Sequence, residues 1–192
     1  FLARQAVESG AVDCVLALGF EQMNPGAIGT MFNDRPSPFE DFDREAAALV
    51  GMPELPLALR YFGGAGQSHM QKYGTPLESF AKVRAKASRH AARNPLALLR
   101  KELSVDDVMN APMLWPGVLT RLMACPPTCG AAAALLVSEA FAKRHGLRTD
   151  VFIAAQAMTT DKPDAFERHD MMNLVGYSMS EAAAQRVYAQ AG

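Results

Sequence analysis

The stretch GAAAALLVSEAFAKRHG, residues 130–146, decides the fold class of this chain. Its small and apolar residues 130–137 predict a buried strand, and Ser138 and Gly146 are the residue types that begin and end a helix. A second apolar run, residues 151–160, predicts another buried strand directly after that helix. Strand, helix and strand with short connections indicate an α/β fold, with these residues opening a second sheet.

The first residues also combine a helix with a strand. Helical spacing of apolar residues ends at Gly10, and residues 12–19 form a nearly continuous apolar run, typical of a parallel strand buried on both faces. No N-cap residue precedes the first helix, while the last helix is expected to begin at Ser180 and to end at Gly192. We therefore expect both ends of the chain to be cuts in a longer protein.

The middle of the chain changes character twice. Residues 20–56 are rich in Gly, Pro, Asn and Asp and predict a long excursion with little regular structure. Helical spacing returns over residues 57–73 and 76–94, so two helices are expected to meet near His69. A short helix is predicted after Ser104, whose hydroxyl suits the N-cap position.

Composition limits the classes of partner. With 192 residues, of which 49% are hydrophobic, the chain can bury one good core. Nineteen Lys and Arg against 20 Asp and Glu give a net charge of −1, so nucleic acid is not expected as a main partner, although a local patch could bind a phosphate. The sequence shows neither a long apolar span nor a signal peptide, and we expect a cytoplasmic location.

The cysteines raise a metal or redox hypothesis. Cys125 and Cys129 form a CxxxC pair, whereas zinc and thioredoxin sites normally use CxxC and need further ligands. Cys14 falls in a predicted buried strand and offers no clear third thiolate. We expect packed, structural thiols without a metal, with a nucleophile at Cys129 and a metal or redox domain as the alternatives.

The histidines and glycines give one further candidate. We expect His90, His145 and His169 on solvated surfaces, whereas His69 is as much a functional candidate as a structural residue. The sequence YFGGAGQSH, residues 61–69, lacks the Lys-Ser/Thr of a phosphate loop and the GxGxxG spacing of a dinucleotide fold. Its small residues therefore indicate close helix packing.

Three stretches together resemble the thiolase family, in the branch that contains the thiolase domain of sterol carrier protein X and bacterial lipid-transfer acyltransferases. They are FLARQAVESGAVDCVLALGFEQM (1–23), SHMQKYGTPLESFAKV (68–83) and CPPTCGAAAALLVSEAF (125–141). Cys129 stands where this family usually has an aspartate, whose carboxylate could accept backbone hydrogen bonds.

The resemblance implies a partial thiolase-like fold, layered α-β-α-β-α. Residues 1–25 would end the first thiolase-like half, residues 26–110 would form a loop domain, and residues 111–192 would run into the second half.

The resemblance also implies which functions this chain carries. The family's nucleophilic cysteine would lie roughly eight residues before Phe1, and its other catalytic groups would follow Gly192, so no catalytic residue is expected here. Coenzyme A is implied as a substrate, with no covalently bound cofactor. The residues implied to line the acyl pocket or the pantetheine path are His69, Met70, Pro127, Thr128 and Gly130, and Glu21 is implied to be structural.

The implied activity of the parent protein is thiolysis of a 3-ketoacyl-CoA. The resemblance to this branch implies substrates with bulky or sterol-type acyl groups. A thiolate attacks the 3-keto carbon, the bond between C2 and C3 breaks, and acetyl- or propionyl-CoA leaves once its C2 takes up a proton. The acyl group then passes from the cysteine to free CoA. This chain alone is expected to be inactive. The alternative is an aldolase-type or non-catalytic relative that works with a small partner protein. The resemblance further implies a homodimer, and a peroxisomal location if the protein is eukaryotic.

Overall fold

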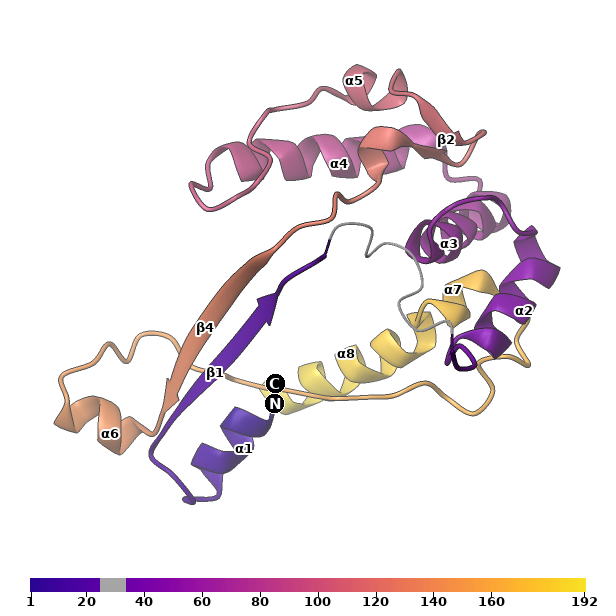
Figure 1. The fold of residues 1–192 in the computed structure, drawn as a ribbon. Coiled ribbons are helices and arrows are strands. Elements are labelled where there is room, and N and C mark those ends of the chain that lie inside the picture. Colours follow the sequence, from indigo (N-terminus) through magenta and orange to yellow (C-terminus); the bar gives the residue numbers. More distant parts are fainter. Residues whose placement is uncertain (25–33) are drawn as a thin grey trace. The chain divides into compact units, whose positions relative to one another are not determined.

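The chain forms two units, and each is described by itself. A computed structural model describes residues 1–24 and 34–192 (Figure 1). The first unit combines Phe1–Asn24, Thr128–Asp161 and Ser178–Gly192, and the second combines Pro25–Pro127 and Lys162–Tyr177. The predicted boundaries after residues 25 and 110 remain a prediction.

A two-stranded antiparallel sheet forms the centre of the first unit. β1 (Cys14–Glu21) pairs with β4 (Gly130–Val137), as the adjacent arrows in Figure 1 show, and α1 (Leu2–Glu8) contacts both strands. Both segments are strands as predicted, but the expected burial of residues 130–137 is wrong, because β4 is exposed from Gly130 to Leu135. The expected parallel direction of the first strand is wrong, and β4 joins the sheet of β1 instead of opening a second sheet.

The expected burial of the first strand is also wrong. Leu16, Leu18 and Phe20 alternate along β1 and therefore lie on one face, where they are 62%, 62% and 78% exposed. The apolar composition of a strand indicates that it suits a buried position. Burial also requires other helices or strands to pack over it, and the composition does not show whether they are present.

A polar cluster ties the beginning of β1 to the end of β4. Ser138 is the N-cap of α6 (Glu139–Arg144) as predicted, because its Oγ accepts a hydrogen bond from Phe141 N. The same hydroxyl donates to Asp13 at 2.7 Å, and Arg144 lies 3.2 Å from the other carboxylate oxygen. The Ser138 hydrogen bond, followed by that of Arg144, lowers the pKa of the Asp13 carboxyl.

The strand predicted at residues 151–160 is absent, because this segment pairs with no strand among the described residues. It lies along α8 (Tyr177–Ala191) instead: Gln156 N donates to Gln190 Oε1 at 3.3 Å, and Thr159 Oγ1 donates to the Met179 carbonyl at 3.1 Å. The predicted N-cap at Ser180 is likewise wrong, since α8 already begins at Tyr177. An apolar run does not specify whether a neighbouring strand exists.

The second unit has a core between three helices: α2 (Glu40–Val50), α3 (Leu57–Tyr73) and α7 (Met171–Leu174). The α2 helix was not predicted from the sequence, although its first turn is acidic, because the preceding breakers dominate the pattern. Part of the predicted irregular excursion, residues 25–33, lies outside the described residues. The fully packed core members are Ala46, Ala65, Met171, Met172 and Leu174.

A second cluster surrounds α4 (Leu77–Ala92) and α5 (Val105–Met109). Ser104 caps α5 as predicted: its Oγ accepts from Asp107 N, and Asp107 accepts from Ser104 N in return. The chain continues through a small hairpin of β2 (Met113–Trp115) and β3 (Leu119–Thr120), followed by the 3-10 turn η1 (Arg121–Met123).

The two long helices follow the sequence prediction closely. α3 has the predicted bounds and ends at Gly74, whose φ of 65° is the left-handed conformation that glycine adopts most easily. α4 falls inside the predicted range 76–94. In the part of the chain that the structure describes, no helix combines the length and the apolar character needed to cross a membrane.

Candidate functional site

Polar contacts with α2 hold α3, the helix that carries the candidate site. Tyr61 donates a hydrogen bond to Asp43 Oδ1 at 2.9 Å, and the Arg60 guanidinium lies 3.4 Å from the same oxygen. Burial, followed by the hydrogen bond to Asp43, raises the pKa of the Tyr61 phenol above its ordinary value. The Tyr61 hydrogen bond therefore ties α3 to α2.

Two glycines let α3 approach its neighbours closely, as predicted from the small residues of this segment. A Cβ on Gly63 would lie 2.8 Å from the Trp115 ring, and one on Gly64 would lie 2.8 Å from the Met171 methyl. Both distances are shorter than real Cβ contacts allow. The glycines thus serve close packing, and Gly63 brings the β2–β3 hairpin onto α3.

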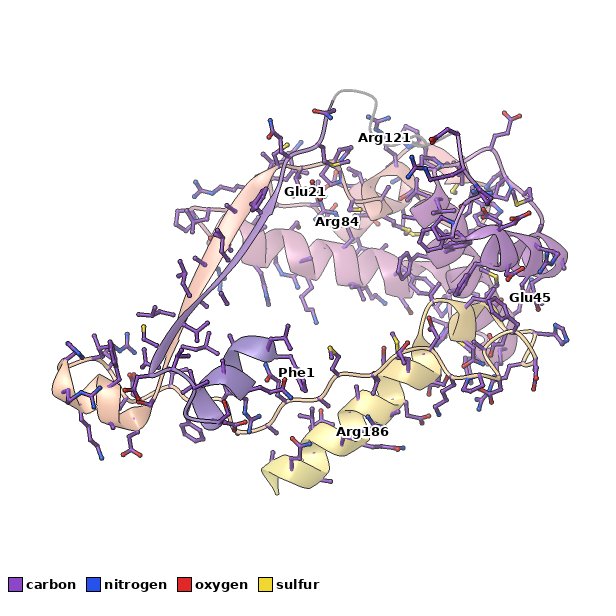
Figure 2. All side chains as sticks on the ribbon, turned by 60° about the horizontal axis from the view of Figure 1, so that its bottom comes forward. Phe1, Glu21, Glu45, Arg84, Arg121 and Arg186 are labelled. Carbon is purple, nitrogen blue, oxygen red and sulfur yellow. The ribbon has the colours of Figure 1, made fainter. Side chains whose placement is uncertain are left out.

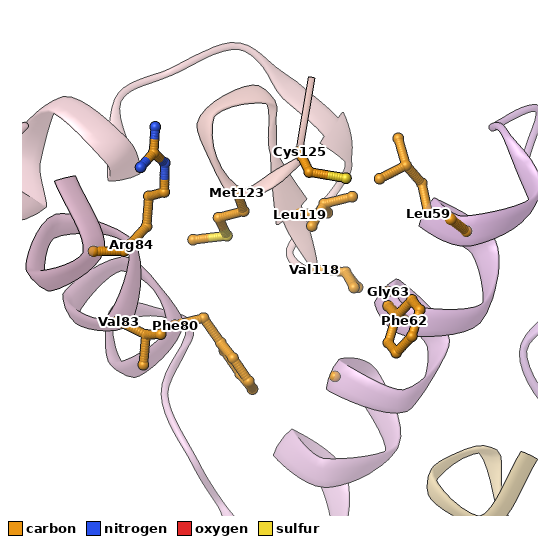
Figure 3. Close-up of a pocket in the computed structure, with 13 residues that line it drawn as sticks. Leu59, Phe62, Gly63, Phe80, Val83, Arg84, Val118, Leu119, Met123 and Cys125 are labelled. Carbon is orange, nitrogen blue, oxygen red and sulfur yellow. The ribbon is translucent and has the colours of Figure 1, made fainter. Parts of the chain in front are cut away.

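An apolar pocket of about 460 Å³ lies between α3, α4 and the hairpin (Figure 3). Its volume falls within the range of roughly 300–1,000 Å³ that is usual for small-molecule sites. Among the described residues of its lining, Arg84 alone is charged, and Arg84 Nε donates to the Leu122 carbonyl at 2.9 Å. The remaining lining residues are Ala58, Leu59, Phe62, Gly63, Gly66, Phe80, Val83, Ala87, Val118, Leu119, Met123 and Cys125.

This pocket was not predicted from the sequence. The sequence did contain a pattern that could have indicated it. On each helix the lining residues recur three or four positions apart and so share one face: 59, 62, 63 and 66 on α3, and 80, 83, 84 and 87 on α4. Such a stripe is normally explained by burial in a core. Phe62 and Val83 are instead 65% and 62% exposed, so these two stripes are incompletely covered.

His69 and Met70 lie on α3, one turn beyond the pocket residue Gly66. The His69 ring packs against Tyr73 at 4.7 Å and against the pocket residue Phe80 at 6.2 Å, measured between ring centroids. This contact confirms that two helices meet near His69. Its Nδ1 is buried, and no described residue hydrogen-bonds to it. His69 therefore adjoins the pocket and has a hydrogen-bonding atom that no described residue uses.

The other implied residues lie around the start of β4. A boundary between the two units falls between Pro127 and Thr128. Pro127 belongs to the second unit, and Thr128 belongs to the first. Gly130 is the register partner of Glu21 at the end of β1, a position visible in Figure 2. The structure thus brings Glu21 and Gly130 together, whereas His69 and Met70 belong to the other unit.

The expectation of packed cysteines is wrong for Cys125 and Cys129, since both thiols are exposed. Cys125 lines the pocket. Cys129 Sγ accepts a hydrogen bond from Met23 N at 3.3 Å, so sulfur serves as the acceptor in this turn. In the described parts of the chain, no three His, Cys, Asp or Glu side chains are grouped as metal ligands would be.

The other three histidines are exposed, as predicted. His169 also has local structure that was not expected: its φ is 46°, and its Nδ1 lies 2.6 Å from Glu45 Oε1. This contact connects the segment before α7 to α2, within the second unit. None of these histidines lines the pocket.

Comparison with a solved structure defines the class of fold. An Ltp2–ChsH2(DUF35) aldolase superposes with a TM-score of 0.68 over 99% of this chain and 47% of that chain, at 22% sequence identity. At this identity the likeness shows the fold alone. The fold is α/β and thiolase-like, as predicted.

Proteins of similar sequence point to the same class. The chain is 43% identical over 193 residues to sterol carrier protein 2 of Bos taurus, covering 100% of this chain and 35% of that protein. It is 30% identical over 169 residues to an acetyl-CoA acetyltransferase of Methanothermobacter thermautotrophicus, covering 88% and 41%. No model of a known protein family matches.

The chain is thus homologous over its whole length to sterol carrier protein 2 relatives, and more distantly to thiolases. It spans about a third of the length of the mammalian relatives that it matches, since their coverage is 35%.

Proposed function

We propose that this chain is the acyl- and coenzyme A-binding part of a thiolase-like acyltransferase. The parent reaction would be thiolysis of 3-ketoacyl-CoA, with bulky or sterol-type acyl groups as substrates. Homology to sterol carrier protein 2 and to an acetyl-CoA acetyltransferase supports the reaction class. The observation that carries the binding role is the apolar pocket of about 460 Å³ between α3, α4 and the hairpin.

The pocket suits an acyl group better than the polar parts of coenzyme A. Apart from the Arg84 guanidinium, its lining is aliphatic, aromatic or sulfur-containing. Burial of apolar ligand surface against such a lining contributes about 25 cal/mol per Å². We assign the acyl chain to this pocket, and coenzyme A is a substrate with no covalently bound cofactor.

His69 is proposed to mark the end of the pocket that faces the thioester. Its ring lies 6.2 Å from that of Phe80, which lines the pocket, and its Nδ1 has no protein partner among the described residues. A buried nitrogen of this kind gains most from a ligand or a further protein group that completes a hydrogen bond. Pro127, Thr128 and Gly130 are assigned to the pantetheine path on the family resemblance.

A pocket-filling variant tests the binding role. Ala87 lines the pocket and is exposed, so Ala87→Trp introduces a large side chain at the rim without disturbing a packed core. Calorimetric titration with a long-chain acyl-CoA should show at least a tenfold loss of affinity, because the indole occupies the space of several methylene groups. Equal affinity in Ala87→Trp and the unchanged chain would remove the pocket from the proposal.

The control variant is Ala184→Trp, which places the same side chain at an exposed position of α8. It should leave acyl-CoA affinity unchanged. If both variants lose affinity equally, the loss reflects a general effect of tryptophan and the pocket assignment fails.

Activity assays separate the two reaction classes. The 192-residue chain should not cleave acetoacetyl-CoA, because the family's catalytic groups fall outside it in the alignment implied by the resemblance. The parent protein should require free CoA for cleavage if it is a thiolase. Cleavage without CoA, or only in the presence of a small partner protein, would support the aldolase-type alternative.

The assembly and location of the parent protein are also part of this proposal. We propose a homodimer that binds acyl-CoA and no nucleic acid, located in the cytoplasm, or in peroxisomes in a eukaryotic cell. Sedimentation of the parent protein tests the dimer.

A further inference from the structure

Residues 82–101 carry an unusual concentration of positive charge. The sequence KVRAKASRHAARNPLALLRK contains Lys82, Arg84, Lys86, Arg89, Arg93, Arg100 and Lys101, with no Asp or Glu. The whole chain has 19 Lys and Arg against 20 Asp and Glu, so its net charge of −1 conceals this segment. A local cationic surface is therefore built into a nearly neutral protein.

The structure places the centre of this charge on one exposed face of α4. Lys82, Lys86 and Arg89 lie in α4 at helical spacing, Arg93 follows as its C-cap, and all four are exposed. Lys82 is paired with Glu78 at 2.9 Å. Within the described residues, Lys86, Arg89 and Arg93 have no carboxylate within salt-bridge distance, so their charge is not neutralised locally.

Apolar side chains project from the turn directly after this face. Leu96 is 91% exposed, Leu98 is 69% exposed and Leu99 is 50% exposed. The turn has a defined conformation, because Asn94 Oδ1 accepts a hydrogen bond from Leu96 N at 3.0 Å. Arg93 and Arg100 flank these leucines in the sequence. Leucines at a turn between cations form a surface with an apolar tip and a positive rim.

We propose that this surface, residues 86–101, binds peripherally to a bilayer that contains anionic phospholipid. The leucines would enter the boundary between headgroups and acyl chains, and the cations would contact headgroup phosphates or carboxylates. Long Lys and Arg side chains suit this arrangement, because their stems can lie along the apolar boundary while the charges stay in the headgroup layer.

An anionic bilayer fits this surface better than an acidic protein or a soluble phosphate does. A soluble phosphate would use the cations but leave three leucines in water, whereas a bilayer uses both features. An acidic protein partner would need apolar pockets at matching positions. The charge and the apolar tip lie within one continuous stretch of chain, which a fluid surface can contact without shape complementarity.

Vesicle flotation with the full 192-residue chain tests the proposal. The chain should bind vesicles of phosphatidylcholine mixed with phosphatidylserine, and should not bind phosphatidylcholine alone. Each cation removed should weaken binding roughly fivefold, so Arg89→Gln with Arg93→Gln should weaken it roughly twenty-fivefold. Leu96→Ser should weaken binding by about tenfold, because the inserted side chain is lost. Salt near 1 M should release the chain, because it screens charges beyond about 3 Å.

Leu96→Trp gives a direct measure of insertion. The chain has one tryptophan, Trp115, which is buried, so the unchanged chain supplies the background emission. The emission of Leu96→Trp should shift to shorter wavelength when anionic vesicles are added. No shift in a variant that still binds the vesicles would overturn the assigned role of the leucines.

Two exposed residues outside this surface serve as control positions. Arg186→Gln removes an exposed cation of α8, and Phe152→Ser removes a side chain that is 81% exposed. Neither should alter vesicle binding. The proposal is overturned by equal binding to neutral vesicles, or by controls that weaken binding as much as the surface variants. It is also overturned if the unchanged chain binds no anionic vesicle. If the Arg89→Gln, Arg93→Gln variant then forms a smaller oligomer than the unchanged chain, the surface is an interface between copies of the chain instead.

Discussion

Gly63→Ala should destabilise the second unit, although alanine is the better helix former. Gly63 lies in α3, and a Cβ at this position would stand 2.8 Å from Trp115 Cε3 and 3.0 Å from Cζ3. Trp115 is only 9% exposed, and its rigid ring has little room to turn away. The added methyl group therefore forces α3 and the β2–β3 hairpin apart.

Two opposing effects determine the size of this change. Replacing glycine by alanine inside a helix stabilises by about 1 kcal/mol. Forcing a methyl group into a packed contact costs roughly 1–3 kcal/mol. Gly66→Ala, in the same helix, isolates the first effect, because a Cβ added there has no described atom within 4 Å apart from the helix's own neighbouring backbone. The difference between the two variants should thus equal the packing cost alone.

Thermal unfolding followed by far-ultraviolet circular dichroism measures that difference. Gly66→Ala should raise the melting temperature, whereas Gly63→Ala should melt below Gly66→Ala by roughly 2–12 °C, since 1 kcal/mol corresponds to about 2–4 °C in a chain of this size. Equal melting temperatures for the two variants would refute the claim that Gly63 is needed for close approach of Trp115.

Two further predictions concern hydrogen bonds at exposed positions. Cys129→Asp should be more stable than the unchanged chain, and Cys129→Ala less stable, because a carboxylate accepts the Met23 N–H bond more strongly than sulfur and alanine cannot accept it; any other order of melting temperatures contradicts this. The Ser104 backbone N–H, followed by the Ser104 hydroxyl, lowers the pKa of the Asp107 carboxyl. Because the folded pKa is lowered, its stabilising effect is present above the ordinary value of about 3.9 and is lost as the pH falls through the folded value. Ser104→Ala should raise the Asp107 pKa part of the way to its ordinary value in an NMR titration, and an unchanged pKa would exclude the hydroxyl as a cause.

The helices were largely predictable from the sequence because their signals are local. Ser104 and Ser138 cap helices through hydrogen bonds to residues three positions away, and Gly74 ends α3 through its own backbone conformation. Each signal acts within one helical turn and does not depend on distant residues. The α2 helix was missed because strong breakers precede its acidic first turn.

The strands and the thiols depended on distant partners. β1 pairs with β4 across more than a hundred residues, and its direction could not be derived from an apolar run. The same limit explains the wrong strand at residues 151–160, which has the composition of a strand and no described strand beside it. Cys125 and Cys129 were expected to be buried because cysteine usually is, but the exposure of a single side chain follows from what packs over it.

The candidate site divides in the same way. Sequence similarity alone identified the thiolase-like relatives and marked His69 and Met70, because homology is carried by residue types in order along the chain. Only the tertiary structure decided that stripes of α3 and α4 and the turn ending at Cys125 enclose one apolar pocket. The sequence determines which side chains each helix presents, but the volume between helices exists only once their packing, here the contact of Gly63 with Trp115, is fixed.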